Sequence, residues 1–344
     1  MFARRRWLIP WLLMAPGLLW LIVFFVLPNI QMVLMSLSSG TLGSGFSFSW
    51  DFANYGDALT KFPVQFRNSL VFGGLATILT FLIGFPLAYG IAFRGGRYKN
   101  VLLFLVIAPF FTSFLIRTIS WRILLGDSGP ILAIGRDFLH LVPDNFTILR
   151  TPLAVVSGLV YQFLPFMVLP LYTSLEKVDF RLVEAARDLY AGPWRRPGAI
   201  VGGLAGAIVG GAIVIGLGYG SLGGEGTTFL LIASLASGAA GAAVGGLLIS
   251  ETFVRVIFPL SLPGVFAGSI LTFIPAIGDY VNAELLGNPK TQMIGNVIQG
   301  RFLEQNDYPT AAALSFILMG AILVAIFFYA RALGTEGLAG GRAG

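Results

Sequence analysis

The sequence lacks cysteine altogether and has a single histidine, His140, among its 344 residues. These shortages exclude disulfide bonds, thiolate metal sites, cysteine nucleophiles and a histidine-rich metal centre. Charged residues are scarce as well: they make up 11% of the chain, compared with roughly 25% in soluble domains. The chain therefore has too little polar surface for a water-soluble enzyme, and we expect a metal-free protein that lies within a lipid bilayer.

Long apolar stretches take up most of the chain, in which hydrophobic residues account for 56%. The first stretch follows Arg4, Arg5 and Arg6 as in a signal sequence, but it exceeds the roughly 7–15 residues of a signal-peptide core, so we expect an uncleaved first span. Stretches near the length of about 20 residues that a membrane helix needs occur at 7–27, 69–93, 101–125, 152–175, 198–219, 227–250, 263–286 and 310–332. The sequence therefore predicts an all-α fold, a polytopic membrane helical bundle.

The distribution of Lys and Arg predicts the orientation of these spans, because loops that stay in the cytoplasm retain basic residues. With the N-terminus inside, the loop with Arg94, Arg97 and Lys99 and the loop at 177–196 are both cytoplasmic and basic. The opposite loops mix basic with acidic residues. We therefore expect both termini in the cytoplasm. The net charge of +6 then reflects loop orientation, and no nucleic-acid partner is expected.

A charged amphipathic stretch follows the fourth span, and a proline-containing run comes much later in the chain. The first contains Glu-Ala-Ala and Asp-Leu, and the second reads Pro-Leu-Ser-Leu-Pro-Gly. Taken alone, the first stretch could be an ordinary solvated connector. Together, the two pieces resemble the cytoplasmic EAA loop of permease subunits in binding-protein-dependent ABC importers. The residues that carry this resemblance are Glu184, Ala185, Ala186, Asp188, Leu189, Pro259, Pro263 and Gly264.

This resemblance implies how the loop works. In the family, a short helix with small residues docks in a cleft of the partner ATPase and transmits its closure to the membrane helices. Glu184 would reach a basic or amide group of the ATPase there. Two departures stand out: Tyr190 occupies the place of the family's glycine, and residues 195–250 split the loop in two.

Other segments extend the likeness over most of the chain. Residues 68–70 and 85–89 match the start of the conserved core of these permeases. Residues 273–280, 285–287 and 293–296 look most like permeases of the spermidine/putrescine class. The resemblance implies a permease subunit that moves polyamines or a related small solute across the bacterial inner (cytoplasmic) membrane by alternating access. It also implies four kinds of partner: an ABC ATPase dimer, a homologous second permease subunit, an extracytoplasmic solute-binding protein and membrane lipid.

The chain offers no site for ATP, because no Gly-x-x-x-x-Gly-Lys-Ser/Thr motif occurs in it. We therefore expect ATP and Mg to bind the partner ATPase, and no cofactor, metal or catalytic residue on this chain. A Gly-x-Gly-x-x-Gly run from Gly218 to Gly223 lies between two membrane-length stretches. It lacks the acidic residue about 20 positions on that a dinucleotide site needs, so it predicts no nucleotide site.

Residues 195–250 form the segment that splits the loop. From 198 to 250 the only charged residue is Glu225, and glycines recur at every fourth position from Gly198 to Gly210. Small residues so spaced let membrane helices approach closely, which predicts an inserted two-helix hairpin. A tolerated insertion at the rim of the bundle and an irregular glycine-rich segment are the alternatives. The chain therefore divides into three regions. Residues 1–194 hold four core spans and the first half of the loop, and residues 195–250 are the inserted segment. Residues 251–344 hold the second half of the loop and two core spans.

Ionisable residues in or near spans are costly and therefore mark candidate solute contacts. A cationic polyamine would be held by carboxylates and by the faces of aromatic rings. The candidates for the substrate pathway are Asp279, Tyr280, Glu284 and Tyr161. The alternative is that Asp279 forms a structural ion pair with Arg117 inside the membrane.

Three other functions stay open at this point. The chain could serve an ABC importer of another solute class, such as sugars, anions or iron chelates. It could be a membrane scaffold that the insertion has uncoupled from its ATPase. An intramembrane enzyme built on His140 with Asp137 and Asp144 is the third, and it is disfavoured because the spans contain no paired nucleophile and base.

Overall fold

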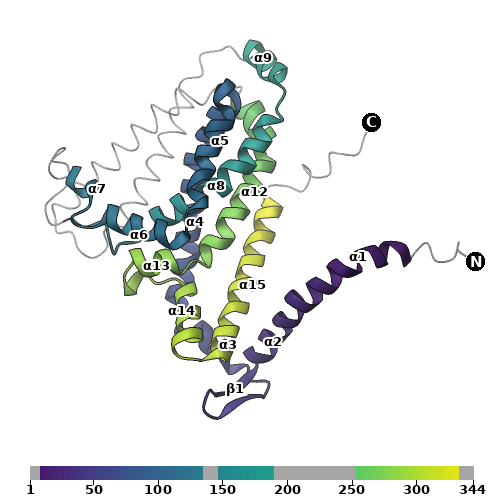
Figure 1. Ribbon diagram of the computed structural model, residues 1–344, viewed down its shortest axis with the longest axis vertical. Coiled ribbons are helices and arrows are strands. Elements are labelled where there is room, and N and C mark those ends of the chain that lie inside the picture. Colours follow the sequence, from purple (N-terminus) through teal and green to yellow (C-terminus); the bar gives the residue numbers. More distant parts are fainter. Residues whose placement is uncertain (1–7, 135–145, 190–252, 333–344) are drawn as a thin grey trace, which may run out of the picture. The chain divides into compact units, whose positions relative to one another are not determined.

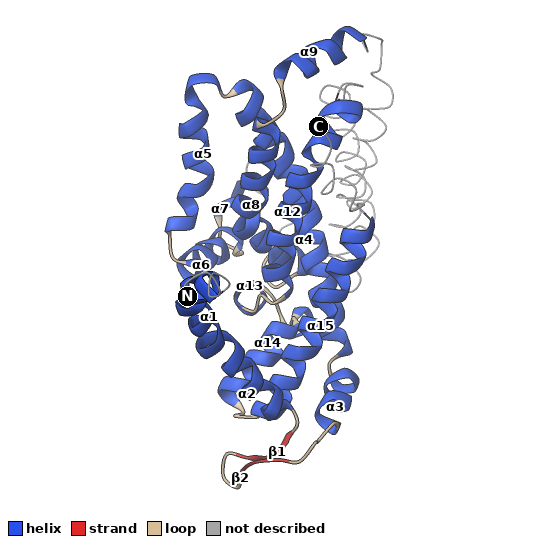
Figure 2. Ribbon diagram, turned by 90° about the vertical axis from the view of Figure 1, so that its right-hand side faces the viewer, coloured by secondary structure: helices blue, strands red, loops and turns tan. Residues whose placement is uncertain are grey.

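The computed structural model describes residues 8–134, 146–189 and 253–332. They belong to two compact units: Met1–Phe66 with Val297–Val324, and Arg67–Asn296 with Ala325–Gly344. The predicted hairpin at 195–250 lies outside the described residues. Helices dominate the rest, and the strands are confined to one short hairpin in the described part of the chain (Figure 2).

The α-helices are α1 (Leu8–Leu21), α2 (Leu27–Ser36), α3 (Ala53–Lys61), α4 (Pro63–Tyr89), α5 (Lys99–Ile107), α6 (Phe114–Leu125), α7 (Pro130–Ala133), α8 (Pro152–Glu176), α9 (Phe180–Leu189), α12 (Phe258–Ile277), α13 (Val281–Leu286), α14 (Ile294–Gln299) and α15 (Tyr308–Ala332). π-Helical turns occur at Ile22–Val26, Gly90–Arg94, Phe253–Ile257 and Gly300–Glu304. 3₁₀ turns occur at Gly96–Tyr98, Ala108–Phe111 and Pro289–Thr291. The strands are β1 (Ser38–Thr41) and β2 (Gly45–Phe48).

Within the residues that the structure describes, five helices are long and apolar enough to cross a membrane: Trp11–Ser36, Pro63–Arg94, Pro152–Glu176, Arg255–Ile277 and Tyr308–Arg331. A sixth crossing results if the bent pair Gly96–Phe111 and Phe114–Ala133 is one span. The prediction of an all-α, polytopic membrane bundle is therefore confirmed. Several boundaries differ from the predicted ones. The first span runs on to Ser36, the span predicted at 69–93 begins at Pro63, and the span predicted at 263–286 runs from Arg255 to Ile277 and ends before α13.

The span predicted at 101–125 is not one continuous helix, because a bend of 95° divides it (Figure 2). Pro109 has no N–H to donate within a helix, and the chain tightens into a 3₁₀ turn at Ala108–Phe111. Thr112 then adopts an extended conformation, with φ −87° and ψ 147°, and ends the turn. α6 consequently starts in a new direction after Ser113.

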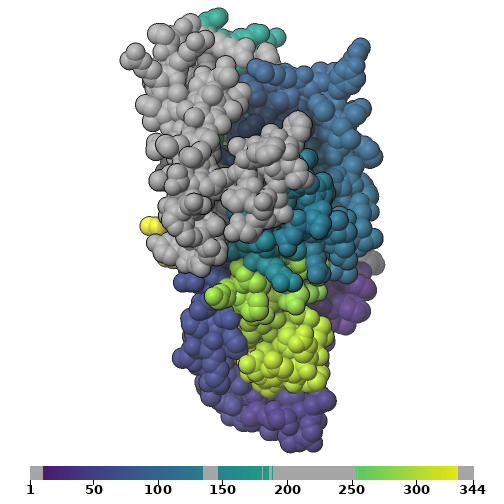
Figure 3. Space-filling view, turned by 90° about the vertical axis from the view of Figure 1, so that its left-hand side faces the viewer, coloured from purple at the N-terminus to yellow at the C-terminus, as the bar shows by residue number. Residues whose placement is uncertain are grey.

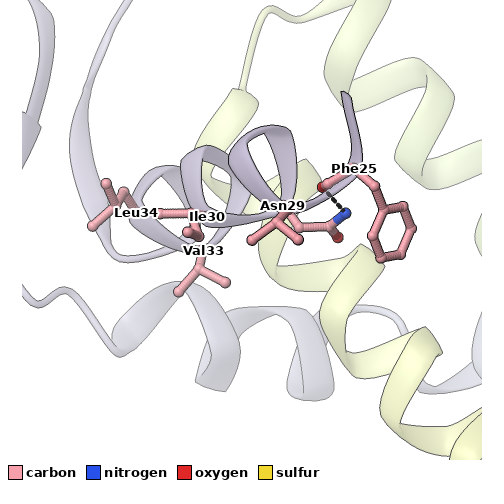
Figure 4. A pocket seen from close by; sticks show the side chains of 6 residues that line it. Phe25, Asn29, Ile30, Val33 and Leu34 are labelled. Atoms are coloured by element: carbon pink, nitrogen blue, oxygen red, sulfur yellow. Dashed lines mark hydrogen bonds between the residues drawn. The ribbon is translucent and has the colours of Figure 1, made fainter. Parts of the chain in front are cut away.

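The first unit contains the span Trp11–Ser36, in which Ser36 is buried and the residues before it are exposed or half-buried, followed by the β1–β2 hairpin. A shallow apolar groove runs along this span, and in it the Asn29 amide donates to the Phe25 carbonyl at 2.8 Å (Figure 4). The antiparallel hairpin pairs Ser38 with Phe48 and Thr41 with Gly45. The span therefore presents most of its apolar side chains to the surroundings.

The core of the second unit is the packing of α8 against α12, with α4 alongside (Figure 1). Glycines set the distance between these helices. A Cβ at Gly264 would lie 2.6 Å from the Pro170 carbonyl oxygen and 2.6 Å from the Ser174 Cβ, and one at Gly268 would lie 2.8 Å from the Met167 sulfur. Small residues at such contacts are what allow membrane helices to approach closely.

Replacing Gly264 by Ala is expected to destabilise the protein, because the methyl group meets the α8 backbone rather than a flexible side chain. We expect a loss of about 1–3 kcal/mol, the usual effect of overpacking, measured as a lower midpoint of thermal unfolding in detergent. Gly74→Ala in α4 is the matched control, since nothing lies within 4 Å of a Cβ there. Equal midpoints for the two variants would contradict the close packing of α8 and α12.

Candidate functional site

The first half of the predicted coupling loop forms α9, at one end of the second unit (Figure 1). The helix begins just after Asp179, whose carboxylate accepts a hydrogen bond from the Arg181 N–H at 2.9 Å. Such a side-chain acceptor satisfies an N–H that the first turn of a helix leaves free. Val183 is buried, while Glu184, Ala185 and Asp188 are exposed. α9 therefore has one face toward the protein and a charged face that is open to a partner.

The second half of the loop packs directly against the first, although residues 190–252 separate them in the sequence. Val183 of α9 belongs to the same apolar cluster as Ile257, which is 2% exposed. Phe253 lies against this cluster, with its ring 5.3 Å from that of Phe85 in α4. Among the predicted coupling residues, Pro259 and Pro263 are exposed and Gly264 is buried against α8. The fold thus brings the split motif back together.

An ion pair that the sequence did not reveal lies next to this loop. Lys99 at the start of α5 is 2.8 Å from the Glu176 carboxylate at the end of α8. The same ammonium lies 5.1 Å from the centre of the Tyr172 ring. The contact joins the start of α5 to the end of α8, although the two residues are 77 positions apart in the sequence. Three residues separate Glu176 from the start of α9.

Asp279, the first pathway candidate, is buried, and its carboxylate accepts hydrogen bonds from other groups of the protein. It is 7% exposed, and its two oxygens accept from the Asn282 N–H at 2.8 Å and the Asn282 amide at 3.2 Å. It lies just past the end of the Arg255–Ile277 span. Burial raises the pKa of Asp279 to about 6, and its hydrogen bonds with Asn282 oppose that shift. The carboxylate therefore orders the turn that leads into α13.

Tyr280 and Glu284, by contrast, are exposed, and one side chain joins them. The Asn296 amide donates to the Tyr280 carbonyl at 2.9 Å and to the Glu284 carboxylate at 3.1 Å. Asn296 itself is 6% exposed, so it is held within the protein while the carboxylate it orients faces outward. No role for Asn282 or Asn296 was predicted from the sequence, because only the tertiary structure brings their amides to these partners.

Tyr161 lies on α8 and stacks on Trp121 of α6, with ring centres 5.2 Å apart and an interplanar angle of 9°. Trp121 also donates to the Ser157 hydroxyl at 3.3 Å. α6 packs against α8 and α13, and the surface of α13 borders that of the α6–α7 region (Figure 3). No direct contact of Tyr161 with the other three candidates is found in the part of the chain that the structure describes. Only Tyr280 and Glu284 share a partner.

The alternative of an ion pair between Arg117 and Asp279 is wrong. Within the described residues the ion pairs are Lys61–Asp57, Lys99–Glu176 and Arg301–Asp307. The Asp279 oxygens face Asn282, and the Arg117 guanidinium lies 5.8 Å from the centre of the Phe110 ring instead.

A cluster of three or more Asp, Glu, His or Cys side chains that could hold a metal ion does not occur in the described part of the chain. His140, Asp137 and Asp144, considered above for an enzyme, lie outside the described residues.

Comparison with known proteins places the chain in a family. Residues 241–333 match the model for the binding-protein-dependent transport system inner membrane component. The chain is 33% identical to the spermidine/putrescine transport system permease protein PotB of Haemophilus influenzae, covering 91% of this chain and 90% of that protein. The chain belongs to this family of permeases.

Two further comparisons agree with the family and the fold. The permease is 31% identical to PotB of Escherichia coli K12, covering 91% of this chain and 95% of the relative. Its fold matches the crystal structure of a bacterial ABC transporter involved in alginate import, with a TM-score of 0.61, 16% identity and 94% of each chain covered. The permease is a transport subunit and a multi-pass membrane protein, as the sequence predicted.

The raised pKa of Asp279 predicts that stability depends on pH. Because the folded-state pKa, about 6, lies above the ordinary 3.8, the carboxyl group favours folding below pH 3.8, and this contribution is lost as pH rises through 6. The loss amounts to at most about 3 kcal/mol, at roughly 1.4 kcal/mol per pKa unit. We expect the unfolding midpoint in detergent to fall between pH 5 and pH 7.5, and to fall less in Asp279→Asn. A parallel fall in both proteins would mean that Asp279 is not the group responsible.

Proposed function

We propose that the permease moves spermidine, putrescine or a closely related polyamine across the bacterial inner membrane, as one of two permease subunits of an ATP-driven importer. One observation carries the coupling part of this proposal: α9 packs against the π-helical turn Phe253–Ile257 while Glu184 and Ala185 stay exposed. An importer whose ATPase is a separate chain needs a loop of this kind, joined to the membrane helices on one side and open to the ATPase on the other.

The packing around α9 supports a route for the transmitted movement. Val183 and Ile257 share a cluster with Phe85 of α4 and with Leu171 and Leu175 of α8. Close-packed interiors transmit displacement rather than absorb it. A push on α9 therefore reaches α4, α8 and α12 together. This is the kind of concerted movement that alternating access requires.

The assignment of sides and partners follows from this proposal. α9 faces the cytoplasm, where an ABC ATPase dimer binds ATP and Mg and docks on Glu184, and both termini lie on that side. An extracytoplasmic solute-binding protein delivers the solute at the opposite end. The solute then passes between this permease and a homologous second permease subunit, within the membrane lipid.

The chemistry of the α13 region supports a polyamine as the solute. The exposed carboxylate of Glu284 can pair with an ammonium group, and the nearby Tyr280 ring, 44% exposed, can contact its methylenes and its charge. The stack of Trp121 and Tyr161 offers a second aromatic surface. Relatives with 31–33% identity bear the names of spermidine/putrescine permeases.

Uptake of labelled spermidine and putrescine into proteoliposomes tests the coupling proposal. The liposomes hold the full chain, its candidate second permease and ATPase, and the binding protein. Glu184→Ala is expected to lower ATP-dependent uptake at least about tenfold, because it removes a charge-assisted contact worth roughly 1.5–3 kcal/mol. Asn100→Ala, at an exposed residue of α5, is the control. Uptake that is equally insensitive to both replacements would contradict coupling through α9.

The solute site is tested in the same liposomes by Glu284→Gln, which removes the charge but keeps the shape. We expect the KM for spermidine to rise about tenfold with a smaller change in kcat, because the carboxylate binds the solute rather than driving the movement. Glu304→Gln, the same replacement at another exposed position, is the matched control. If both variants keep the KM of the unmodified protein, Glu284 is not a solute contact.

A further inference from the structure

The guanidinium group of Arg117 is buried without a partner. Arg117 is 8% exposed, and its Nε and Nη1 atoms are buried and donate to no acceptor in the part of the chain that the structure describes. The guanidinium carbon lies 5.8 Å from the centre of the Phe110 ring, so an aromatic face is next to the charge. An ionised side chain in such a place is costly unless it is paired. We therefore expect an anionic group to bind the Arg117 guanidinium.

The position of Arg117 along the spans limits where that anion can come from. The Phe110 ring contacts Phe166 of α8 at 5.4 Å, and Trp121, one turn beyond Arg117, stacks on Tyr161 of α8. Both contacts lie at least nine residues from either end of the span Pro152–Glu176. Nine helical residues extend about 14 Å. Arg117 thus lies beside the middle of a span, far from the phosphates of the lipid headgroups.

In the part of the chain that the structure describes, no carboxylate forms an ion pair with Arg117. The Asp279 oxygens face the N–H and the amide of Asn282, and the Glu284 carboxylate is exposed and held by Asn296. The proposed solute is a cation and would be repelled. A carboxylate on another membrane-embedded chain remains.

The surface around Arg117 is open to such a chain. Phe110, whose ring lies next to the guanidinium, is 48% exposed. The outer face of α6 is apolar and exposed as well, through Leu115, Ile116, Ile119 and Ile123. A helix from a second subunit could cover this face and reach the guanidinium beside the Phe110 ring.

We propose that Arg117 binds a carboxylate of the second permease subunit, so that the bend between α5 and α6 is part of the interface between the two permeases. The inference rests on the proposed function, which supplies the second subunit. Arginine suits this role because its planar fork binds a carboxylate through two parallel hydrogen bonds. A lysine at the same place keeps the charge but not the fork.

The first experiment measures how long the two permeases stay together in the purified complex. Arg117→Gln is expected to speed the dissociation of the second permease about tenfold, and Arg117→Lys to speed it less. Arg122→Gln, at an exposed arginine of the same helix, is the matched control and should dissociate like the unmodified complex. The unfolding midpoint of each isolated chain shows whether a variant has simply failed to fold. Unchanged dissociation of a folded Arg117→Gln complex would overturn the proposal.

The second experiment identifies the partner group with the Arg117→Lys variant and a membrane-permeable carbodiimide. The reagent activates a carboxylate, the lysine amine attacks it, an amide bond forms and the carboxylate oxygen leaves in the urea. Mass spectrometry should find residue 117 joined to an Asp or Glu of the second permease. A product within this chain, no product at all, or an anionic lipid retained only when Arg117 is intact would each overturn the proposal. Neither experiment measures uptake, so both can fail while the transport proposal stands.

Discussion

The close approach of α8 and α12 is the constraint on which the second unit depends. Gly264 and Gly268 leave no room for a Cβ between α12 and the α8 residues Met167, Pro170 and Ser174. In lipid there is no hydrophobic driving force between helices, so backbone proximity and good packing have to supply the stability. α8 leads into α9, which holds the first half of the predicted coupling loop, and α12 contains Pro259, Pro263 and Gly264 of the second half. Packing α8 against α12 therefore also brings the two halves together, although residues 190–252 separate them in the sequence.

A second constraint governs the irregular segment that follows α12. Buried backbone polar groups that no helix or sheet pairs need hydrogen-bond partners elsewhere in the protein. Here amide side chains do this: Asn68 donates to the carbonyls of Lys290 and Gln292, Asn296 to that of Tyr280, and Asn282 to the Asp279 carboxylate. The short helices α13 and α14 are thereby fixed, and with them the outward direction of Glu284.

The charged side chains of the second unit follow the same logic, with one exception. Lys99 at the start of α5 pairs with Glu176 at the end of α8 near the surface, and the buried Asp279 is held by Asn282. Arg117 is the other buried charged residue of the described chain, and its Nε and Nη1 atoms have no partner. Within the described residues nothing compensates for this charge, so a group on another chain is needed to do so.

The sequence by itself determined the membrane class and the approximate positions of the core spans, because length and apolarity are local properties. The Glu-Ala-Ala and Pro-Gly patterns also predict a coupling motif, and Glu184 of this motif lies on the exposed side of α9. It did not predict the bend after Pro109, the rejoining of α9 with Phe253–Ile257, or the pairing of Asp279 with Asn282 rather than Arg117. Those features depend on which residues meet across tens or hundreds of positions. Only the packing of α4, α8 and α12 decides that, since a side chain's partner in lipid is set by the helix that faces it and not by its neighbours in the chain.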